Sequence, residues 1–411
     1  MTEYALTGAK IITPYMEIKN GTLLISENKI LAVGRGENVV IPEGMKRIDV
    51  SGLTMLPGFI DIHTHGSLGA SASDSLEGIR KIYEYLPSTG ITSWLPTILD
   101  ERGINVIVSA IKDQESGSKI LGIHMEGPFL TPKNIPGSPY EEPRYPNMKE
   151  YEGMLKQSEG NIRIMGLSPE LDGAIPVVRE MRRTGVVAAA AHSKATYEQL
   201  MAGVDAGIQH ITHAFNVMTG FHHRKPGVVG GALVCDALTA EMIADGYHVS
   251  PVAMEMLLRC KGIEKVALIS DNTRYAGLED GIYENVEVKD GVVRRIGYTE
   301  ETDGTMAGSV WSLDNNIRTI KRHLGRSLKE ISIMASCVPA KVAGVYQNKG
   351  SLEPGKDADI TLIDADWNVV SCIIGGKLSY LDDSWKSEVR SQRSEVRGWK
   401  SEVGSQRLED R

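Results

Sequence analysis

Six side chains that could bind a metal ion or transfer a proton lie far apart along the chain, and each follows a short apolar run. They are His63, His65, Glu126, His192, His213 and Asp271. Imidazole and carboxylate groups are typical ligands of Zn²⁺ or Fe²⁺ sites that keep open coordination positions. Such a site generates hydroxide near neutral pH. The residue types therefore indicate a hydroxide-generating metal site, provided that the fold brings them together.

The segments that must position these side chains alternate between short apolar runs and helix-like stretches, which is typical of parallel strands joined by crossover helices. We expect eight strands, the number that closes a barrel. They are predicted at 59–63, 92–95, 120–125, 162–168, 186–191, 210–213, 239–244 and 266–270. The carboxyl ends of barrel strands meet on one face, where active sites lie. The predicted fold class is therefore α/β, a (β/α)8 TIM-like barrel.

The two ends of the chain differ from the barrel region. Residues 1–54 and 340–382 contain short β-rich runs and turns, and we expect them to pair into one small β-sandwich domain, since neither alone makes a stable sheet. The catalytic barrel is predicted to span 55–339. The tail, 385–411, repeats KSEVRSQR as KSEVGSQR, with one apolar residue per seven where a coiled coil needs two. We predict that this low-complexity tail is disordered.

Bulk properties exclude several classes of protein. The 411 residues suffice for a barrel of about 250 residues and a smaller domain. A net charge of −8 argues against nucleic acid and anionic membranes as partners. Four scattered cysteines favour reduced thiols and a cytoplasmic location. The N-terminus does not resemble a signal peptide, and no apolar run reaches the roughly 18 residues of a membrane span.

The metal candidates fall into two sets. His63 and His65 stand at positions i and i+2, so both imidazoles face the same side of a strand and can reach one metal. Glu126, His192 and His213 follow other strands and favour a ligand set of two histidines and one carboxylate. Taken singly, each also fits a loop or core residue. We expect the nearby His124 to be a supporting or core residue, and His210 to face the barrel wall.

Asp271 ends the apolar run VALIS. A carboxylate beside activated water can take its proton and later deliver it to a leaving group. Asp also serves well as a helix N-cap, which is the structural alternative.

Further polar residues offer weaker signals for substrate binding. Arg224 could hold an anionic group bidentately, and Asn216 lies in the same segment. Asp245 and His248 follow another strand, and the small-residue segment 304–316 could donate backbone N–H groups to an anion. Each of these features is also compatible with ordinary loop chemistry.

Taken in order, the motifs resemble those of the N-acetylglucosamine-6-phosphate deacetylase family of the amidohydrolase superfamily. The matching stretches are PGFIDIHTHG, HMEGPF, AHSKAT, THAFN, HRKPG, IADGYH, SDNT and GTMAGS. The segment GSLEPGKDADITLID resembles the strand pair that closes the small domain in the superfamily. The resemblance covers about residues 1–380 and leaves out the tail.

The resemblance implies a metal-dependent amide hydrolase that acts on an N-acetyl amino sugar phosphate. Glu126, His192 and His213 match the ligands of the main metal, Zn or Fe. His63 and His65 match a pair that would hold a second metal. Asp271 matches the catalytic aspartate. Substrate-contacting positions correspond to Asn216, Val217, Arg224, Asp245, His248, Met306, Ala307 and Gly308. Part of the phosphate site comes from a neighbouring subunit in the family, which implies a homodimer.

Two departures from the family pattern lie where the substrate would bind. The stretch NIPGSPYEEPRYP has Ser138 and Pro139 where the family usually carries a histidine that helps to polarise the acetyl carbonyl. Asn272-Thr273-Arg274-Tyr275 replaces a small, proline-containing segment.

Three functions therefore stay open. The first is deacetylation of N-acetylglucosamine 6-phosphate to glucosamine 6-phosphate and acetate. The second is hydrolysis of another N-acyl amino sugar phosphate, such as N-acetylgalactosamine 6-phosphate, or of an N-acyl amino acid or cyclic amide. The third is an inactive sugar-phosphate-binding protein.

Overall fold

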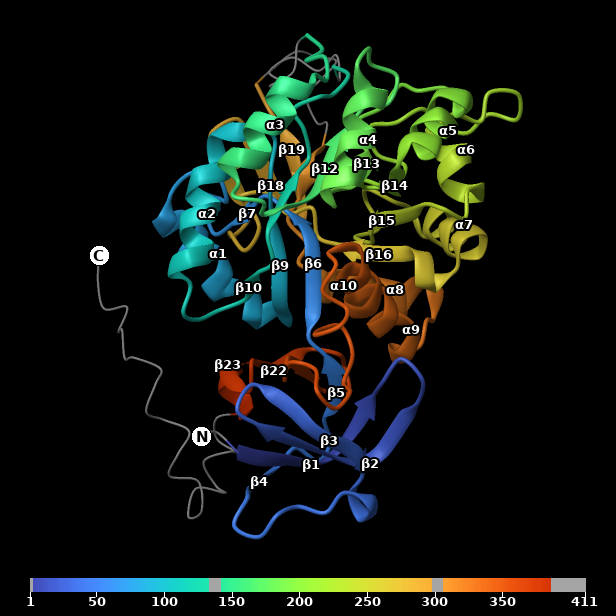
Figure 1. Cartoon of the computed structure of the whole chain (residues 1–411). Coiled ribbons are helices and arrows are strands. Elements are labelled where there is room, and N and C mark those ends of the chain that lie inside the picture. The colour runs from blue at the N-terminus through green and yellow to red at the C-terminus, as the bar shows by residue number, and fades with distance from the viewer. Residues whose placement is uncertain (1–2, 133–141, 298–305, 386–411) are drawn as a thin grey trace.

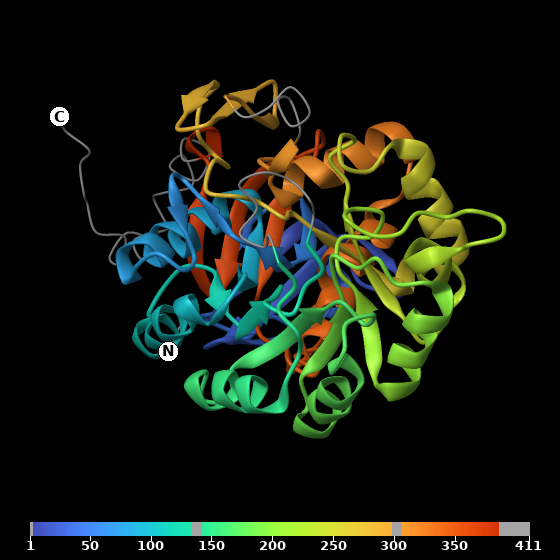
Figure 2. The ribbon, with the colours of Figure 1, turned by 90° about the horizontal axis from the view of Figure 1, so that it is seen from above.

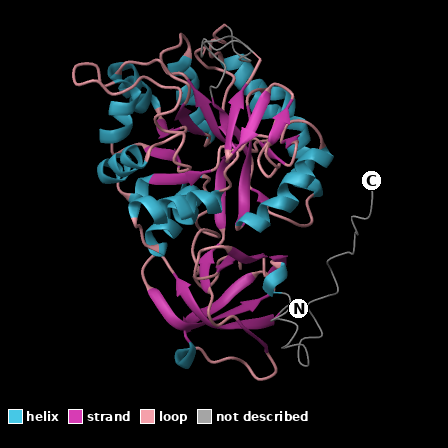
Figure 3. Ribbon diagram, turned by 180° about the vertical axis from the view of Figure 1, so that it is seen from behind, coloured by secondary structure: helices cyan, strands magenta, loops and turns pink. Residues whose placement is uncertain are grey.

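The computed structural model describes residues 3–132, 142–297 and 306–385. The predicted disordered tail lies outside the described residues from residue 386 onward, as do Ser138 and Pro139. Figure 1 shows a larger body of strands surrounded by helices above a smaller β sheet, and Figure 3 shows the same two parts from behind.

The larger body contains the eight predicted parallel strands in the order of the chain. Their bounds are β6 (Phe59–Thr64), β9 (Ile91–Ile98), β11 (Ile123–Met125), β12 (Ile162–Leu167), β13 (Val187–Ala190), β14 (Ile208–Ile211), β15 (Thr239–Ile243) and β16 (Val266–Ile269). A short strand, β10 (Lys119–Ile120), also pairs with β9, so the third predicted strand is split. Between β16 and β6 the barrel closes where the Asp271 N–H donates to the His63 carbonyl at 2.9 Å. The predicted barrel is confirmed.

The sixth strand differs from the prediction of 210–213. The structure ends β14 at Ile211, and the chain turns away from the sheet at His213, whose φ of 29° lies in the left-handed region. The sequence run GIQHITH therefore contains both the strand and the turn that follows it.

Helices cover the outside of the barrel, as the view from above shows (Figure 2). They are α1 (Leu76–Tyr85), α2 (Ile104–Asp113), α3 (Met148–Gln157), α4 (Ala174–Thr184), α5 (Tyr197–Ala206), α6 (Gly227–Val234), α7 (Pro251–Lys261) and α8 (Leu313–Leu324). The short helices α9 (Leu328–Ser332) and α10 (Val338–Val342) follow, and residues of α10 pack against the apolar cluster inside the barrel. Thr196 and Gln199 form a capping box at the start of α5, and Gly207 ends the helix. After α1 the chain continues as a 3₁₀ turn to Thr89, and Gly90 reverses it with a φ of 80°.

Side chains alternate between the inside of the barrel and the helix layer. On β15, Ala240 and Met242 belong to the cluster packed between strands and helices, whereas Ile243 belongs to the apolar cluster inside the barrel. Ile60, Ile62 and other strand residues fill that interior. The barrel is therefore a packed core, and a binding site can lie only at an end of it.

The two ends of the chain form one eight-stranded sheet. Its strands are β1 (Glu3–Ile12), β2 (Glu17–Ser26), β3 (Lys29–Arg35), β4 (Lys46–Asp49), β5 (Thr54–Pro57), β21 (Ile360–Ile363), β22 (Val369–Ile374) and β23 (Lys377–Leu381). The antiparallel pairing of β5 with β21 joins the N-terminal strands to the C-terminal ones. Buried side chains from both halves form one apolar cluster. β5 runs almost directly into β6, which connects this sheet to the first barrel strand.

A further small sheet follows Asp271 and was not predicted. It consists of β17 (Gly281–Tyr283), β18 (Val286–Lys289), β19 (Val292–Arg295) and β20 (Met306–Ser309). Two short strands, β7 (Gly66–Ser67) and β8 (Ala70–Ser71), form a hairpin just after β6. Among the described residues, no helix is long and apolar enough to cross a membrane.

Candidate active site

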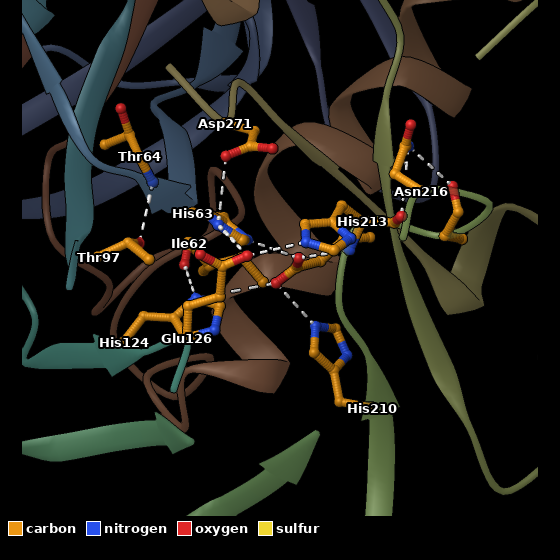
Figure 4. Close-up of polar contacts among 12 residues, drawn as sticks. Ile62, His63, Thr64, Thr97, His124, Glu126, His210, His213, Asn216 and Asp271 are labelled. Atoms are coloured by element: carbon orange, nitrogen blue, oxygen red, sulfur yellow. Dashed lines mark hydrogen bonds and ion pairs between the residues drawn. The ribbon is translucent and has the colours of Figure 1, made fainter. Parts of the chain in front are cut away.

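The candidate metal ligands and Asp271 converge at the carboxyl ends of the barrel strands. Figure 4 shows Glu126, His63, His213 and Asp271 pointing toward one another. His63 lies near the end of β6, and Glu126 directly follows β11. His192 follows β13 by two residues, as His213 follows β14 and Asp271 follows β16. Residues that are remote in sequence therefore meet because parallel strands end at one face.

Three of these residues have a strained backbone. The φ angles are 45° at His192, 29° at His213 and 49° at Asp271. A residue other than glycine in this region costs of order 1–3 kcal/mol and persists where the surrounding structure requires it. In each case the left-handed residue turns the chain out of its strand.

Glu126, His192 and His213 form one tight group. Glu126 Oε1 lies 2.7 Å from His192 Nε2 and 2.8 Å from His213 Nε2, and the two nitrogens are 3.0 Å apart. All three side chains are buried. Two imidazole nitrogens and one carboxylate oxygen thus face a common point.

A second group lies beside the first and shares its carboxylate. His63 Nε2 and His65 Nε2 are 3.3 Å apart, and each lies 3.4 Å from Asp271 Oδ1. The other oxygen of Glu126, Oε2, is 3.3 Å from His65 Nε2. Glu126 therefore lies between the two groups and presents one oxygen to each.

These groups strongly perturb the protonation of one another. Burial lowers the pKa of His63, but the charges of Asp271 and Glu241 outweigh it and raise that pKa to about 10. Burial of His65 is likewise outweighed by its bonds to Asp271 and Glu126, which raise its pKa to about 9. Burial raises the pKa of Asp271, but His63 and His65 bring it down to about 2. Without a bound cation, His63 and His65 therefore carry positive charge beside the ionised carboxylate of Asp271.

The same arrangement fits divalent cations. Zn–N and Zn–O bonds of about 2.0–2.1 Å in a tetrahedral site place ligand atoms about 3.3 Å apart. The separations within the two groups, 2.7 to 3.4 Å, are near that value. Each group offers imidazole nitrogen and carboxylate oxygen from side chains whose atoms lie within 4.8 Å of one another. The chain therefore carries candidate ligand groups for a divalent metal.

Below the two groups lies a buried charged residue that sequence reasoning missed. Glu241, on β15, is fully buried and faces the barrel interior beside His63 and His210. His210 was expected at the barrel wall, but its Nε2 lies 3.1 Å from Glu241 Oε1. The signal was a single charge within the strand TAEMI, in step with the inward-facing Ile243.

His124 is a core residue, as expected. Its Nδ1 donates to the Ile62 carbonyl at 2.8 Å, and its ring lies 4.6 Å from that of His63, centroid to centroid. Burial and the neighbouring His63 lower its pKa to about 3. His124 therefore packs beneath the ligands as a neutral ring.

Asp245 and His248 form a rigid turn after β15. Asp245 Oδ1 accepts from the backbone N–H groups of Tyr247 and His248 at 2.8 Å, and Oδ2 bonds His248 Nδ1 at 2.6 Å. Burial lowers the pKa of His248, but the bond to Asp245 and the charges of Asp245 and Asp271 raise it overall. Asp245 thus holds the turn, and His248 is the side chain of the two that is available to a ligand.

Asn216, Val217 and Arg224 lie in the loop between β14 and α6. The Asn216 amide donates to the carbonyls of His213 and Ala214 at 3.3 Å, so it supports the strained turn at His213. Val217 and Arg224 are exposed, and the Arg224 guanidinium bonds His223 in the same loop at 2.8 Å. The loop extends outward beside α5 and α6 (Figure 1). Among the described contacts, none joins Arg224 to the metal-ligand groups.

The strand Met306–Ser309, β20, lies against Asp271. The Ser309 N–H donates to the Asp271 carbonyl at 3.2 Å, and the Thr273 N–H donates to the Ser309 carbonyl at 3.0 Å. Gly308 has a φ of 83°, and a Cβ there would lie 2.3 Å from Thr273 Cγ2, so only glycine fits. Gly308 and Ser309 therefore lie beside the backbone of Asp271, and Met306 and Ala307 precede them on the same strand.

Arg274 is turned away from these residues. Its guanidinium donates to the Gly69 carbonyl at 2.8 and 3.1 Å, and Asp74 lies 3.9 Å away. This arginine ties the loop after Asp271 to the β7–β8 hairpin.

Comparisons with known proteins agree with this geometry. The chain belongs to the amidohydrolase family, whose model matches residues 54–379. An N-acetylglucosamine-6-phosphate deacetylase of Bacillus subtilis (strain 168) is 33% identical over 90% of this chain and 96% of its own length. An N-acetylgalactosamine-6-phosphate deacetylase of Escherichia coli O157:H7 is 34% identical over 79% of this chain and 87% of its own.

A solved structure is also similar. It is a mutant N-acetyl-D-glucosamine-6-phosphate deacetylase from Mycobacterium smegmatis in complex with N-acetyl-D-glucosamine 6-phosphate. The two chains are 28% identical with a TM-score of 0.84, and the match covers 92% of this chain and all of that one. The resemblance predicted from the motifs is confirmed.

Proposed function

We propose that this protein is a metal-dependent hydrolase that removes the acetyl group from N-acetylglucosamine 6-phosphate, releasing glucosamine 6-phosphate and acetate. The observation that carries the proposal is the convergence of Glu126, His192 and His213 with Asp271 at the open end of the barrel. A protein that only binds sugar phosphates needs neither a full ligand set nor a proton-transfer carboxylate beside it.

In this proposal, Glu126, His192 and His213 hold a divalent cation, Zn or Fe. When bound, it would supply Lewis acidity toward the acetamide carbonyl and the attacking water. Asp271 takes a proton from the water at Oδ1 and delivers it to the leaving nitrogen. The pKa of Asp271 lies below neutral pH, so its side chain is in the ionised form that a general base requires. The Met306–Gly308 strand borders the same space and contacts the substrate.

The substrate could also be the epimeric sugar, and N-acetylgalactosamine 6-phosphate has specific support as the alternative. The relatives named for the two epimers are 33% and 34% identical to this chain. The two departures of this chain from the family sequence pattern also correspond to positions where the family would bind its substrate. Deacetylation should be assayed on both sugars, each with and without the 6-phosphate. Release of acetate from neither phosphorylated sugar would contradict the proposal.

Arg224 is proposed to bind the substrate phosphate, together with His248 and the neighbouring Asn216–Val217 turn. Arg224→Ala should lose about 10- to 150-fold in kcat/KM on the phosphorylated sugar, the value of one charge-assisted contact at about 1.5–3 kcal/mol. The loss on the unphosphorylated sugar should be small, because the hydrolytic groups are unchanged.

The matched control for Arg224 is its neighbour, Lys225, which is exposed in the same loop. Lys225→Ala also removes one positive charge, but a lysine cannot bind a phosphate through two parallel N–H groups as arginine does. We therefore expect a smaller loss of kcat/KM on the phosphorylated sugar. Equal losses of the Arg224 variant on both sugars would mean that the anion site has been assigned to the wrong residue.

The second ligand group, His63 and His65 with Asp271, is proposed to hold a second cation. Protein purified without chelator and reconstituted with excess Zn²⁺ should then contain nearly two metal ions per chain, measured by elemental analysis. Because Glu126 presents one oxygen to each group, both sites share a carboxylate. A stoichiometry fixed near one would assign these histidines to another role.

We also propose a cytoplasmic homodimer, in which the outward loop carrying Arg224 reaches the site of the partner subunit. The exposure of that loop supports this arrangement. Sedimentation would give the mass in solution.

The proposed domains are the small sheet domain from 1–54 and 340–382, the barrel from 55–339, and the tail. The pairing of β5 with β21 supports the first of them. The first residues of the segment 340–382, Ala340 and Val342, pack against the interior of the barrel rather than against the small sheet.

A further inference from the structure

The buried carboxylate of Glu241 contacts both candidate ligand groups from below. Its Oε2 accepts from His63 Nδ1 at 2.9 Å and from the backbone N–H of His213 at 2.9 Å. Its Oε1 accepts from His210 Nε2 at 3.1 Å. One side chain thus holds a ring of one ligand group and the backbone of the other.

The position is an unfavourable one for a charge. Glu241 faces the interior of the barrel, where its strand neighbour Ile243 belongs to a wholly apolar cluster, and it is fully buried. A carboxylate in such surroundings is costly unless every oxygen is paired. Here both oxygens are paired, with donors from β6, from the turn after β14 and from His210.

The bond to His63 decides which nitrogen of that ring faces the candidate metal site. With a proton on Nδ1 directed at Glu241, the ring turns Nε2 toward His65, Asp271 and Glu126, and Nε2 would become a ligand once a bound cation displaced its proton. The hydrogen bond from the His213 N–H to Glu241 acts on the group of Glu126, His192 and His213. It anchors the backbone of His213, where φ is 29°. Relaxation of that turn would move His213 Nε2 away from Glu126.

We propose that Glu241 is a positioning residue that couples the two ligand groups, so that its loss weakens cation binding in both at once. His210 is the outer partner that keeps the carboxylate in place, since its Nδ1 is held in turn by Thr239 at 2.6 Å. Partners of this kind typically change metal affinity 10- to 100-fold when removed. The inference rests on the metal centre of the proposed function.

The test is Zn²⁺ affinity, measured by competition with a chelator in wild type, Glu241→Gln and the exposed control Glu77→Gln. Gln keeps the shape but loses the charge and turns one acceptor into a donor. We expect both binding steps to weaken by about 10- to 100-fold in Glu241→Gln and to stay unchanged in Glu77→Gln. The absorption spectrum of the Co²⁺ form should also change, because the ligand geometry changes.

A double variant separates coupling from a local effect. In a His63→Ala background, Glu241→Gln should still weaken the cation held by Glu126, His192 and His213, through the His213 backbone. No further loss in that background would overturn the coupling.

A purely structural role would lower the melting temperature of the metal-free protein and leave Zn²⁺ affinity unchanged, which also overturns the inference. If Glu241→Gln does not fold, Glu241→Asp replaces it. Asp keeps the charge but withdraws it by one methylene, and wild-type Zn²⁺ affinity in that variant would count against the inference. Wild-type protein that binds no Zn²⁺ would instead contradict the proposed metal centre itself.

Discussion

Asp271→Asn is expected to lower kcat by about 10²- to 10⁴-fold, the range for loss of a general acid–base group. The amide keeps the shape of the side chain but cannot accept the proton of the attacking water. Asp271 Oδ1 lies 3.4 Å from the Nε2 atoms of both His63 and His65, so its position serves both proton transfer and coordination. Steady-state kinetics on the phosphorylated N-acetyl sugar, with metal content measured in parallel, give the result.

The interpretation of this variant depends on metal being retained. We expect the Glu126, His192 and His213 group to remain loaded, since Asp271 is not one of its three ligands. The matched control is Asp74→Asn, the same chemical change at a half-exposed residue beside Arg274, which should have near-wild-type turnover. Near-normal kcat in Asp271→Asn would falsify the assignment and leave Asp271 as a structural residue of the turn.

His192→Ala should remove bound metal and activity together. It deletes one of two imidazoles in the buried group, where His192 Nε2 lies 2.7 Å from Glu126 and 3.0 Å from His213. Several kcal/mol of transition-state stabilisation from a Lewis acid correspond to a rate loss of at least about 10³-fold. Elemental analysis and the deacetylase assay measure the two effects on one preparation.

The fold should survive this substitution. The strand before it, β13, is packed by alanines that the substitution leaves unaffected. The control is His323→Ala, an exposed histidine in the last turn of α8, which should keep metal and activity. Full metal content in a folded His192 variant would exclude His192 from the ligand set.

The sequence by itself determined the barrel and its catalytic end. Apolar runs separated by helical segments leave few alternatives to a parallel sheet, and a polar residue after each run falls at the same end of it. The sequence alone therefore predicts that one face of the barrel carries His63, Glu126, His192, His213 and Asp271. The pairing of the terminal segments was also predicted, because neither segment contains enough strands to be stable alone.

The tertiary structure alone decided how these residues are held. The left-handed turn at His213 took that residue out of the sixth predicted strand, since local sequence does not reveal a conformation that is imposed by the surrounding packing. Tertiary contacts also turned Arg274 toward Gly69 and placed β20 against Asp271. Glu241 shows the difference most clearly. A lone charge in an apolar strand becomes interpretable only when its partners from β6, from His210 and from the turn at His213 are known, because the hydrogen bonds that stabilise it join residues far apart in sequence.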